Sequence, residues 1–255
     1  MASSNSSSDW YAVWFDSPHY HQLYGHRSQA EASAFIGALH QHAGWSNLEL
    51  LDLACGKGRH AKAAASLGHR VTGIDLSKNS IREARQLHSD TPGLEFVEGD
   101  MRSFQLQRDF DGVLNLFTSF GYFKDKGDHL AVLRSIHAHL KPNGFLILDF
   151  LDAEFTHRHL VPSDVINRDG VEYHIERKVE EAIGENWPHF IKRISLETPD
   201  GAVEHVERVA ALEEPQLSQM LAESGFEVLE RWGNYALAPW KKGETPRLIL
   251  HARKS

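Results

Sequence analysis

The stretch from residue 48 to residue 150 alternates short apolar runs with helical segments, and this alternation restricts the folds open to the chain. Strands separated by helices are joined by crossovers, so they pair in parallel and form a sheet with helices on both faces. The sequence therefore predicts an α/β fold. The expected strands and helices are, in order, Leu48–Leu53, Arg59–Leu67, Arg70–Asp75, Ser77–His88, Leu94–Glu98, Phe110–Leu116, Asp125–Leu140 and Phe145–Phe150.

The alternation of expected strands and helices stops after residue 160 and resumes near the end of the chain. Three long β-like runs, Val171–Ala182, Trp187–Leu196 and Ala202–Leu212, are separated by the turn-forming segments Gly184-Glu185-Asn186 and Pro199-Asp200-Gly201, which predicts an antiparallel insert. A helix over Pro215–Glu223 and strands over Phe226–Trp232 and Arg247–Ala252 then complete a core of seven strands.

These patterns divide the chain into four expected parts. Ser-rich residues 1–8 form a disordered tail, and residues 9–44 form a helical cover that contains the aromatic-rich stretch Trp10–Tyr24. Residues 45–160 and 213–255 form the core, and residues 161–212 form the insert, which covers the substrate or mediates dimerisation. In the insert Val171, Tyr173 and Ile175 alternate with polar residues, so one apolar face needs covering and a homodimer is expected.

Composition excludes several classes of partner. The chain has 27 Lys and Arg against 35 Asp and Glu, a net charge of −8, and so has no general attraction for nucleic acid. Its 17 His are scattered without the spacing of a zinc site, and no metal is expected. Cys55 is the single cysteine, and no apolar leader or stretch of about 18 apolar residues is present, so we expect a cytoplasmic protein without a membrane span.

The segment from Leu50 to Ala61 joins a strand to a helix through a glycine-rich turn. Gly56 and Gly58 allow a sharp bend and the close approach of a ligand. Because Gly56-x-Gly58-x-x-Ala61 also fits a dinucleotide fingerprint, a nicotinamide-dependent oxidoreductase is an alternative. Asp52, four residues before Gly56, disfavours it, since a carboxylate repels a pyrophosphate but suits a ligand that carries an ammonium and a sulfonium.

Acidic or polar residues follow each of the next three expected strands. Asp75 lies 19 positions after Gly56, close to the spacing at which an acid meets ribose hydroxyls, although it could instead cap the helix that starts at Ser77. Asp100 follows the third strand and Asn115-Leu116 the fourth. Open α/β sheets bind ligands at this edge, and a loop aspartate on the surface is the alternative for Asp100.

These blocks together resemble the class I S-adenosylmethionine-dependent methyltransferases over residues 45–255. The resemblance rests on Asp52-x-x-Cys55-Gly56-x-Gly58, Gly73-Ile74-Asp75-Leu76-Ser77, Gly99-Asp100-Met101-Arg102 and Leu140-Lys141-Pro142-Asn143-Gly144. It implies a seven-strand, mostly parallel, Rossmann-like sheet and S-adenosylmethionine as cofactor. The matching positions imply that Gly56 and Gly58 pass under its methionine part and that Asp75 accepts hydrogen bonds from both ribose hydroxyls. They also imply that Asp100 and Met101 contact the adenine. The expected cofactor-binding set is Tyr20, Arg27, Asp52, Ala54, Gly56, Gly58, Asp75, Leu76, Asp100, Met101, Asn115 and Leu116.

A narrower resemblance reaches the branch that contains bacterial amino-sugar N-methyltransferases. It is carried by the segment Tyr20–Arg27, the loop Phe117–Tyr122 and the insert. It implies that Tyr20 and Arg27 contact the methionine carboxylate and that Phe117, Ser119 and Tyr122 bind the substrate. The expected reaction is methyl transfer to N or O of a small molecule, with a non-catalytic cofactor-binding module as a further alternative. No catalytic residue is assigned; His21, Tyr122 and His157 are unranked candidates for a base with a hydroxyl acceptor.

Overall fold

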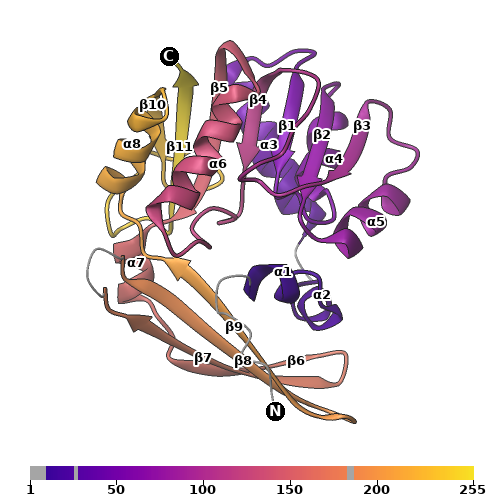
Figure 1. Ribbon diagram of the computed structural model, residues 1–255, viewed down its shortest axis with the longest axis vertical. Helices are drawn as coiled ribbons and strands as arrows, with labels where there is room; N and C mark the ends of the chain where they lie inside the picture. The colour runs from indigo at the N-terminus through magenta and orange to yellow at the C-terminus, as the bar shows by residue number, and fades with distance from the viewer. Residues whose placement is uncertain (1–9, 26–27, 183–186) are drawn as a thin grey trace.

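The computed structural model describes residues 10–25, 28–182 and 187–255, which contain two β-sheets (Figure 1). The larger sheet has the order β10-β11-β5-β4-β1-β2-β3, and in it β11 alone runs in the direction opposite to the other strands. This confirms the predicted seven-strand, mostly parallel core. The strands are β1 (Glu49–Leu53), β2 (Arg70–Asp75), β3 (Leu94–Glu98), β4 (Phe110–Asn115), β5 (Leu140–Leu151), β10 (Phe226–Trp232) and β11 (Arg247–Lys254).

Helices cover both faces of this sheet. Serine side chains begin two of them: Ser28 accepts hydrogen bonds from the first turn of α3, and Ser77 accepts one from Ser80 N–H in α5. The predicted helix Asp125–Leu140 was too long, because α6 ends at Ala138 and Leu140 already begins β5. The helices around the sheet are α3 (Gln29–Ala43), α4 (Arg59–Ala65), α5 (Lys78–Leu87), α6 (Lys126–Ala138), α7 (Ala153–Arg158) and α8 (Glu214–Glu223).

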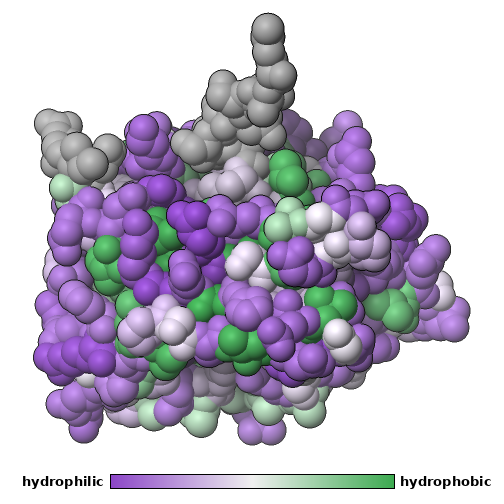
Figure 2. Space-filling model, turned by 90° about the horizontal axis from the view of Figure 1, so that it is seen from below, coloured by the Kyte–Doolittle hydropathy of each residue, from purple (hydrophilic) through white to green (hydrophobic). Residues whose placement is uncertain are grey.

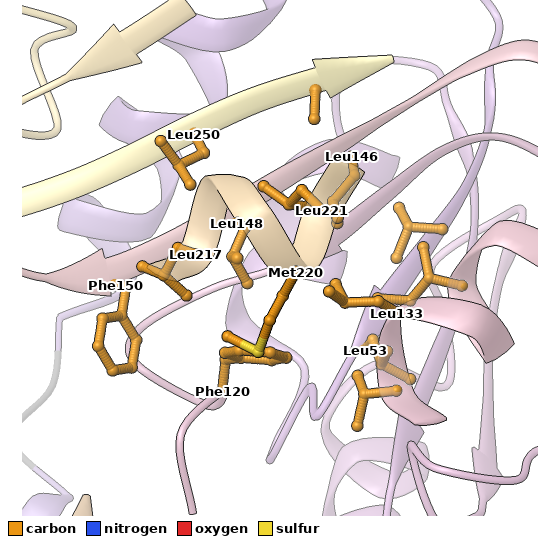
Figure 3. Packing of buried hydrophobic residues seen from close by; sticks show 14 of the residues in the cluster. Leu53, Phe120, Leu133, Leu146, Leu148, Phe150, Leu217, Met220, Leu221 and Leu250 are labelled. Atoms are coloured by element: carbon orange, nitrogen blue, oxygen red, sulfur yellow. The ribbon is translucent and has the colours of Figure 1, made fainter. Parts of the chain in front are cut away.

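The sheet is buried on both faces, as parallel sheets are. On one face, α8 directs Leu217, Met220 and Leu221 onto apolar side chains of β5 and β11 (Figure 3). On the other face, Phe35, Ile36 and other residues of α3 and α4 pack against β1 and β2. Burial on both sides fixes the strand register, and with it the positions of the loops at the carboxyl edge.

The second sheet is antiparallel, with the order β6-β7-β8-β9, and confirms the predicted antiparallel insert. Its strands are β6 (Ser163–Arg168), β7 (Val171–Glu180), β8 (His189–Thr198) and β9 (Gly201–Ala210). The sequence did not indicate β6, because no residue of this edge strand is buried and only Val165 and Ile166 are apolar. The expected turn Gly184-Glu185-Asn186 and the expected tail 1–8 lie outside the described residues.

The inner face of the second sheet is covered by the N-terminal helices α1 (Trp10–Trp14) and α2 (Pro18–Tyr24). Trp14 and Leu23 form one buried cluster with apolar residues of β7 and β8, namely Tyr173, Ile175, Ile194 and Leu196. The premise of the dimer prediction, an uncovered apolar face, was therefore wrong, and a homodimer stays a prediction without that support. Figure 2 shows the molecule from the side of this sheet, with apolar residues dispersed among hydrophilic ones.

The N-terminal helices are also attached to the large sheet. Asp16, between α1 and α2, accepts hydrogen bonds from Ser77 Oγ at 2.6 Å and from Asn79 N–H at 2.9 Å. These bonds fix the cover beside the carboxyl end of β2. Among the described helices, none is long and apolar enough to cross a membrane.

A buried histidine makes the stability of the fold sensitive to acid. His129 of α6 donates to the Asp125 carbonyl oxygen at 3.0 Å and packs against Phe120, Phe123 and Trp187. Burial lowers its pKa to about 4, so protons bind the unfolded chain more tightly than the folded one. Stability is then lost as the pH falls through 6.5, by about 2 kcal/mol between pH 7.5 and pH 5 from this group. Urea unfolding should show this loss, and a smaller loss in His129→Leu; an identical loss in both proteins would contradict the assignment.

Candidate active site

A cavity of about 430 Å³ lies at the carboxyl ends of β1 and β4, where the strand order of the large sheet reverses. This is the position at which open α/β sheets bind ligands. Its walls come from the large sheet, from α1 and α2, and from β9 of the second sheet. The lining contains nine of the residues expected from the sequence: Tyr20, Asp52, Ala54, Gly56, Asp75, Leu116, Phe117, Ser119 and Tyr122.

A smaller cavity of about 50 Å³ adjoins it and shares Phe15, Ala54, Asp75 and Tyr122 with it. It contains three further expected residues, Leu76, Asp100 and Met101, which follow β2 and β3. Tyr11, Phe15 and Phe123 supply aromatic walls to this smaller cavity. A flat aromatic ligand group fits between such walls.

The glycine-rich turn follows β1 and is held to the neighbouring strand, because Cys55 N–H donates to the Ile74 carbonyl oxygen at 2.9 Å. Gly56 has a φ of +55° and lines the large cavity. Gly58, at φ +80°, begins α4 and lies against Phe96; an added Cβ would come within 2.4 Å of that ring. The structure thus places Gly58 in the packing beneath the turn, outside the described lining of both cavities.

Asp75 joins the turn to the end of β2. One carboxylate oxygen accepts from Gly56 N–H and the other from Ser77 N–H, each at 2.8 Å. Burial raises the pKa of this carboxyl group. The N-cap of α5 is Ser77, so Asp75 does not cap the helix itself; it holds the amide of the N-cap residue and also lines both cavities. A carboxylate offers about four acceptor positions, so these bonds leave room for a ligand hydroxyl.

Asp52 lies on the floor of the large cavity and is almost completely buried. It accepts a hydrogen bond from Ala61 N–H in the first turn of α4 at 3.0 Å. Burial raises the pKa of its carboxyl group to about 7, and the neighbouring Asp75 adds to the rise. Two carboxylates with raised pKa values in one cavity favour a cationic ligand, which would restore their ionised forms.

Asp100 is held by a neighbouring guanidinium. Arg102 binds both of its carboxylate oxygens, at 3.1 Å through Nε and at 2.6 Å through the outer nitrogen. Although Asp100 is partly buried, these hydrogen bonds keep its pKa below the usual value. The Arg102 guanidinium also lies 5.0 Å from the centre of the Phe123 ring. These contacts order the loop that contains Met101, and Asp100 also lines the smaller cavity.

Three other predicted residues differ in their placement. Asn115 is fully buried and donates to the Leu53 carbonyl oxygen at 3.1 Å, so it links β4 to β1 and does not line either described cavity. Arg27 lies outside the described residues. Of the candidate bases, His21 and Tyr122 line the cavity, whereas His157 is exposed on α7.

The insert was expected to cover the substrate or mediate dimerisation, but the sequence did not indicate which of its residues line the cavity. Glu207 of β9 lines the cavity and accepts hydrogen bonds from Trp14 Nε1 at 2.7 Å and Tyr24 OH at 2.8 Å. Lys192 of β8 donates to the same tyrosine hydroxyl. In the sequence Glu207 is one charged residue of an alternating strand, and only the packing of α1 and α2 on the sheet places it in the site.

The seven-strand sheet with its antiparallel β11, the glycine-rich turn after β1 and the acids after β2 and β3 define the class I methyltransferase fold. The family model described as "Methyltransferase domain" matches residues 50–144, which contain the turn and both acids. Residues 50–144 therefore match a methyltransferase domain, and the fold built around them is the class I methyltransferase fold.

Comparisons with individual proteins agree with this class. The dTDP-3-amino-3,4,6-trideoxy-alpha-D-glucopyranose N,N-dimethyltransferase of Streptomyces venezuelae is 34% identical over 48% of this chain and 50% of its own length. The chain thus spans about half of that relative. The glycine/sarcosine N-methyltransferase of Parasynechococcus marenigrum is 27% identical over 88% of this chain and 77% of its own. A solved S-adenosylmethionine-dependent methyltransferase from Clostridium acetobutylicum superposes with a TM-score of 0.73 at 18% identity, over 95% of this chain and 97% of that one.

Proposed function

We propose that the protein is an S-adenosylmethionine-dependent methyltransferase that methylates the nitrogen of a small-molecule amine, with an amino sugar as the favoured acceptor. The observation that carries the proposal is the pair of carboxylates, buried Asp52 and half-buried Asp75, in the cavity after the glycine-rich turn. The two relatives described above support transfer to nitrogen by their names. The same acids disfavour a nicotinamide dinucleotide, whose pyrophosphate is anionic.

The residues present fit S-adenosylmethionine. Asp52 would face its ammonium group, the Ala54–Gly56 turn would pass under its methionine part, and Asp75 would accept from its ribose hydroxyls. The smaller cavity, with Leu76, Asp100 and Met101, would hold the adenine. Tyr20 and Arg27 remain the proposed partners of the carboxylate, and Leu116 a proposed neighbour of the cofactor. When bound, the cofactor supplies an electrophilic methyl group on a sulfonium.

The protein's own contribution is to bind, align and dehydrate the reactants. Alignment of this kind can supply about 7 to 11 kcal/mol of a barrier. Phe117, Ser119 and Tyr122 line the part of the cavity proposed for the acceptor, together with Trp10 and Glu207. Glu207 would attract an acceptor as its ammonium form, which must lose its proton to solvent before the neutral nitrogen attacks the methyl group. The aromatic rings would keep water away from the reactants. An amine that reaches the site in neutral form needs no base.

Binding and turnover test this function separately. Calorimetry should show S-adenosylmethionine and S-adenosylhomocysteine binding one site per chain, and no comparable binding of a nicotinamide dinucleotide. Incubation with S-adenosylmethionine and the sugar nucleotide of the Streptomyces venezuelae relative should then give a methylated product by mass spectrometry. Dinucleotide binding without S-adenosylmethionine binding would overturn the proposal. Cofactor binding without methylation of any amine in a broad metabolite panel would favour the non-catalytic module.

A further inference from the structure

Two consecutive residues in the cavity wall have an unusual backbone conformation. Phe117 and Thr118, which follow β4 after Leu116, have φ values of +61° and +62°. Residues other than glycine rarely adopt this left-handed region, and a β-branched residue such as threonine does so least readily. Both residues line the large cavity. Such a conformation persists only when surrounding contacts enforce it.

The enforcing contacts come from Asp149 of β5, which is completely buried. Its carboxylate accepts from Phe117 N–H at 2.7 Å, and its carbonyl oxygen accepts from Thr118 N–H at 3.0 Å. The amide groups of both left-handed residues are therefore fixed by one residue of a neighbouring strand.

Arg247, the first residue of β11, completes the arrangement. Its guanidinium pairs with Asp149 through Nε at 2.8 Å and an outer nitrogen at 2.6 Å, and that outer nitrogen also donates to Thr118 Oγ1 at 2.8 Å. Tyr235 OH donates to the same carboxylate at 3.2 Å. A buried carboxylate needs such a partner, and the planar guanidinium suits two acceptors at once.

The ring of Phe117 is in turn held from the side of the glycine-rich turn. The Arg59 guanidinium, in the first turn of α4, lies 4.3 Å from the centre of that ring. Phe117 thus stands between the proposed cofactor side and the loop that continues to Ser119 and Tyr122. A small rotation of its backbone would alter the space in which donor and acceptor meet.

We propose that Asp149 and Arg247 are positioning residues for methyl transfer, which hold Phe117 and Thr118 in the left-handed conformation and so fix the wall that orients the acceptor. The inference rests on the proposed function. Neither Asp149 nor Arg247 is part of the described cavity lining, so both act through the loop. In-line displacement is sensitive to such placement, because misplacement by about 1 Å can cost about a hundredfold in rate.

Thr118→Val tests the role with the least risk to folding, because it removes only the hydroxyl acceptor and keeps the shape. With S-adenosylmethionine and the sugar nucleotide named above, we expect kcat/KM for the acceptor to fall at least tenfold. The Kd for S-adenosylhomocysteine should stay within twofold of the wild type. Amide hydrogen exchange over residues 116–119 should accelerate in the same variant. Thr118→Ser, which keeps the hydroxyl, should restore both values.

Arg247→Lys keeps the charge but loses the two-acceptor geometry, and should resemble Thr118→Val. Arg253→Lys is its matched control, because Arg253 lies on the same strand and pairs with Glu227 on the surface at 2.7 Å. Wild-type kcat/KM in Thr118→Val, or unchanged exchange over residues 116–119 in both Thr118→Val and Arg247→Lys, would overturn the positioning role. Failure of the wild type to methylate any amine would instead overturn the proposed function, while the exchange rates still report on the loop.

Discussion

Asp75→Ala is expected to weaken S-adenosylmethionine binding at least tenfold and to lower stability in the same protein. Hydrogen bonds from ribose hydroxyls to a charged group are worth about 1.5 to 3 kcal/mol, and about 1.4 kcal/mol is one decade in Kd. The carboxylate also accepts from Gly56 N–H and Ser77 N–H, so the substitution leaves two amides of the site without their partner. Loss of a comparable helix cap costs about 1 kcal/mol. Calorimetry and urea unfolding on one preparation give both values.

Asp75→Asn is the matched variant, because its amide retains one acceptor oxygen at nearly the same volume. We expect a smaller loss of affinity and of stability than for alanine. If the Kd of Asp75→Ala stays at the wild-type value while its melting temperature falls, Asp75 acts only as a brace for the turn and α5, and the ribose assignment is wrong.

The affinity for S-adenosylmethionine is expected to fall about tenfold between pH 8 and pH 6, because Asp52 must release a proton to face the cationic cofactor. Its pKa of about 7 in the free protein means that acid converts it to the neutral form before binding. A tenfold change follows from linkage when the bound form stays ionised over this range. Calorimetry in two buffers of different ionisation enthalpy should also detect the released proton.

The same raised pKa predicts the opposite trend in stability. A carboxyl group whose folded pKa exceeds its unfolded value stabilises the fold below the unfolded pKa, and this contribution is lost as the pH rises through about 7. The full difference, from 3.8 to about 7, corresponds to about 4 kcal/mol. Asp52→Asn should therefore bind the cofactor more weakly, with little dependence on pH, and unfold at higher urea at pH 8. Asp90→Asn, on the surface, is the control. If cofactor affinity in Asp52→Asn still depended steeply on pH, Asp52 would not be the group whose ionisation controls binding.

The sequence predicted those features that depend on local patterns. β2, β3 and β10 have the predicted bounds because each is a short run between clear turn or helix signals. β6 and α7 were missed. An exposed edge strand and a six-residue helix bury too few side chains to require regularly spaced apolar residues in the sequence. Local patterns therefore specify the elements that form the core more clearly than those at its margin.

The candidate site likewise contains residues that the sequence indicated and residues that it did not. Residues at strand ends could be gathered at one edge, but position alone does not say where a side chain points, and Asn115 turns toward Leu53 in the neighbouring strand. Glu207, Asp149 and Arg247 come from distant strands that meet only through packing. Side-chain direction and long-range pairing are consequences of the assembled fold.

The packing of the first helices on the second sheet joins segments far apart in the chain, as in the bond between Trp14 and Glu207, which are 193 residues apart. At a synthesis rate of about 5 to 20 residues per second, about 10 to 40 s pass between the appearance of these two residues on the ribosome. During that interval the aromatic residues of α1 and α2 have no sheet to cover. The N-terminal wall of the cavity is thus synthesised first and is among the last parts to pack in place. Until then the nascent chain exposes an aromatic segment that chaperones can protect.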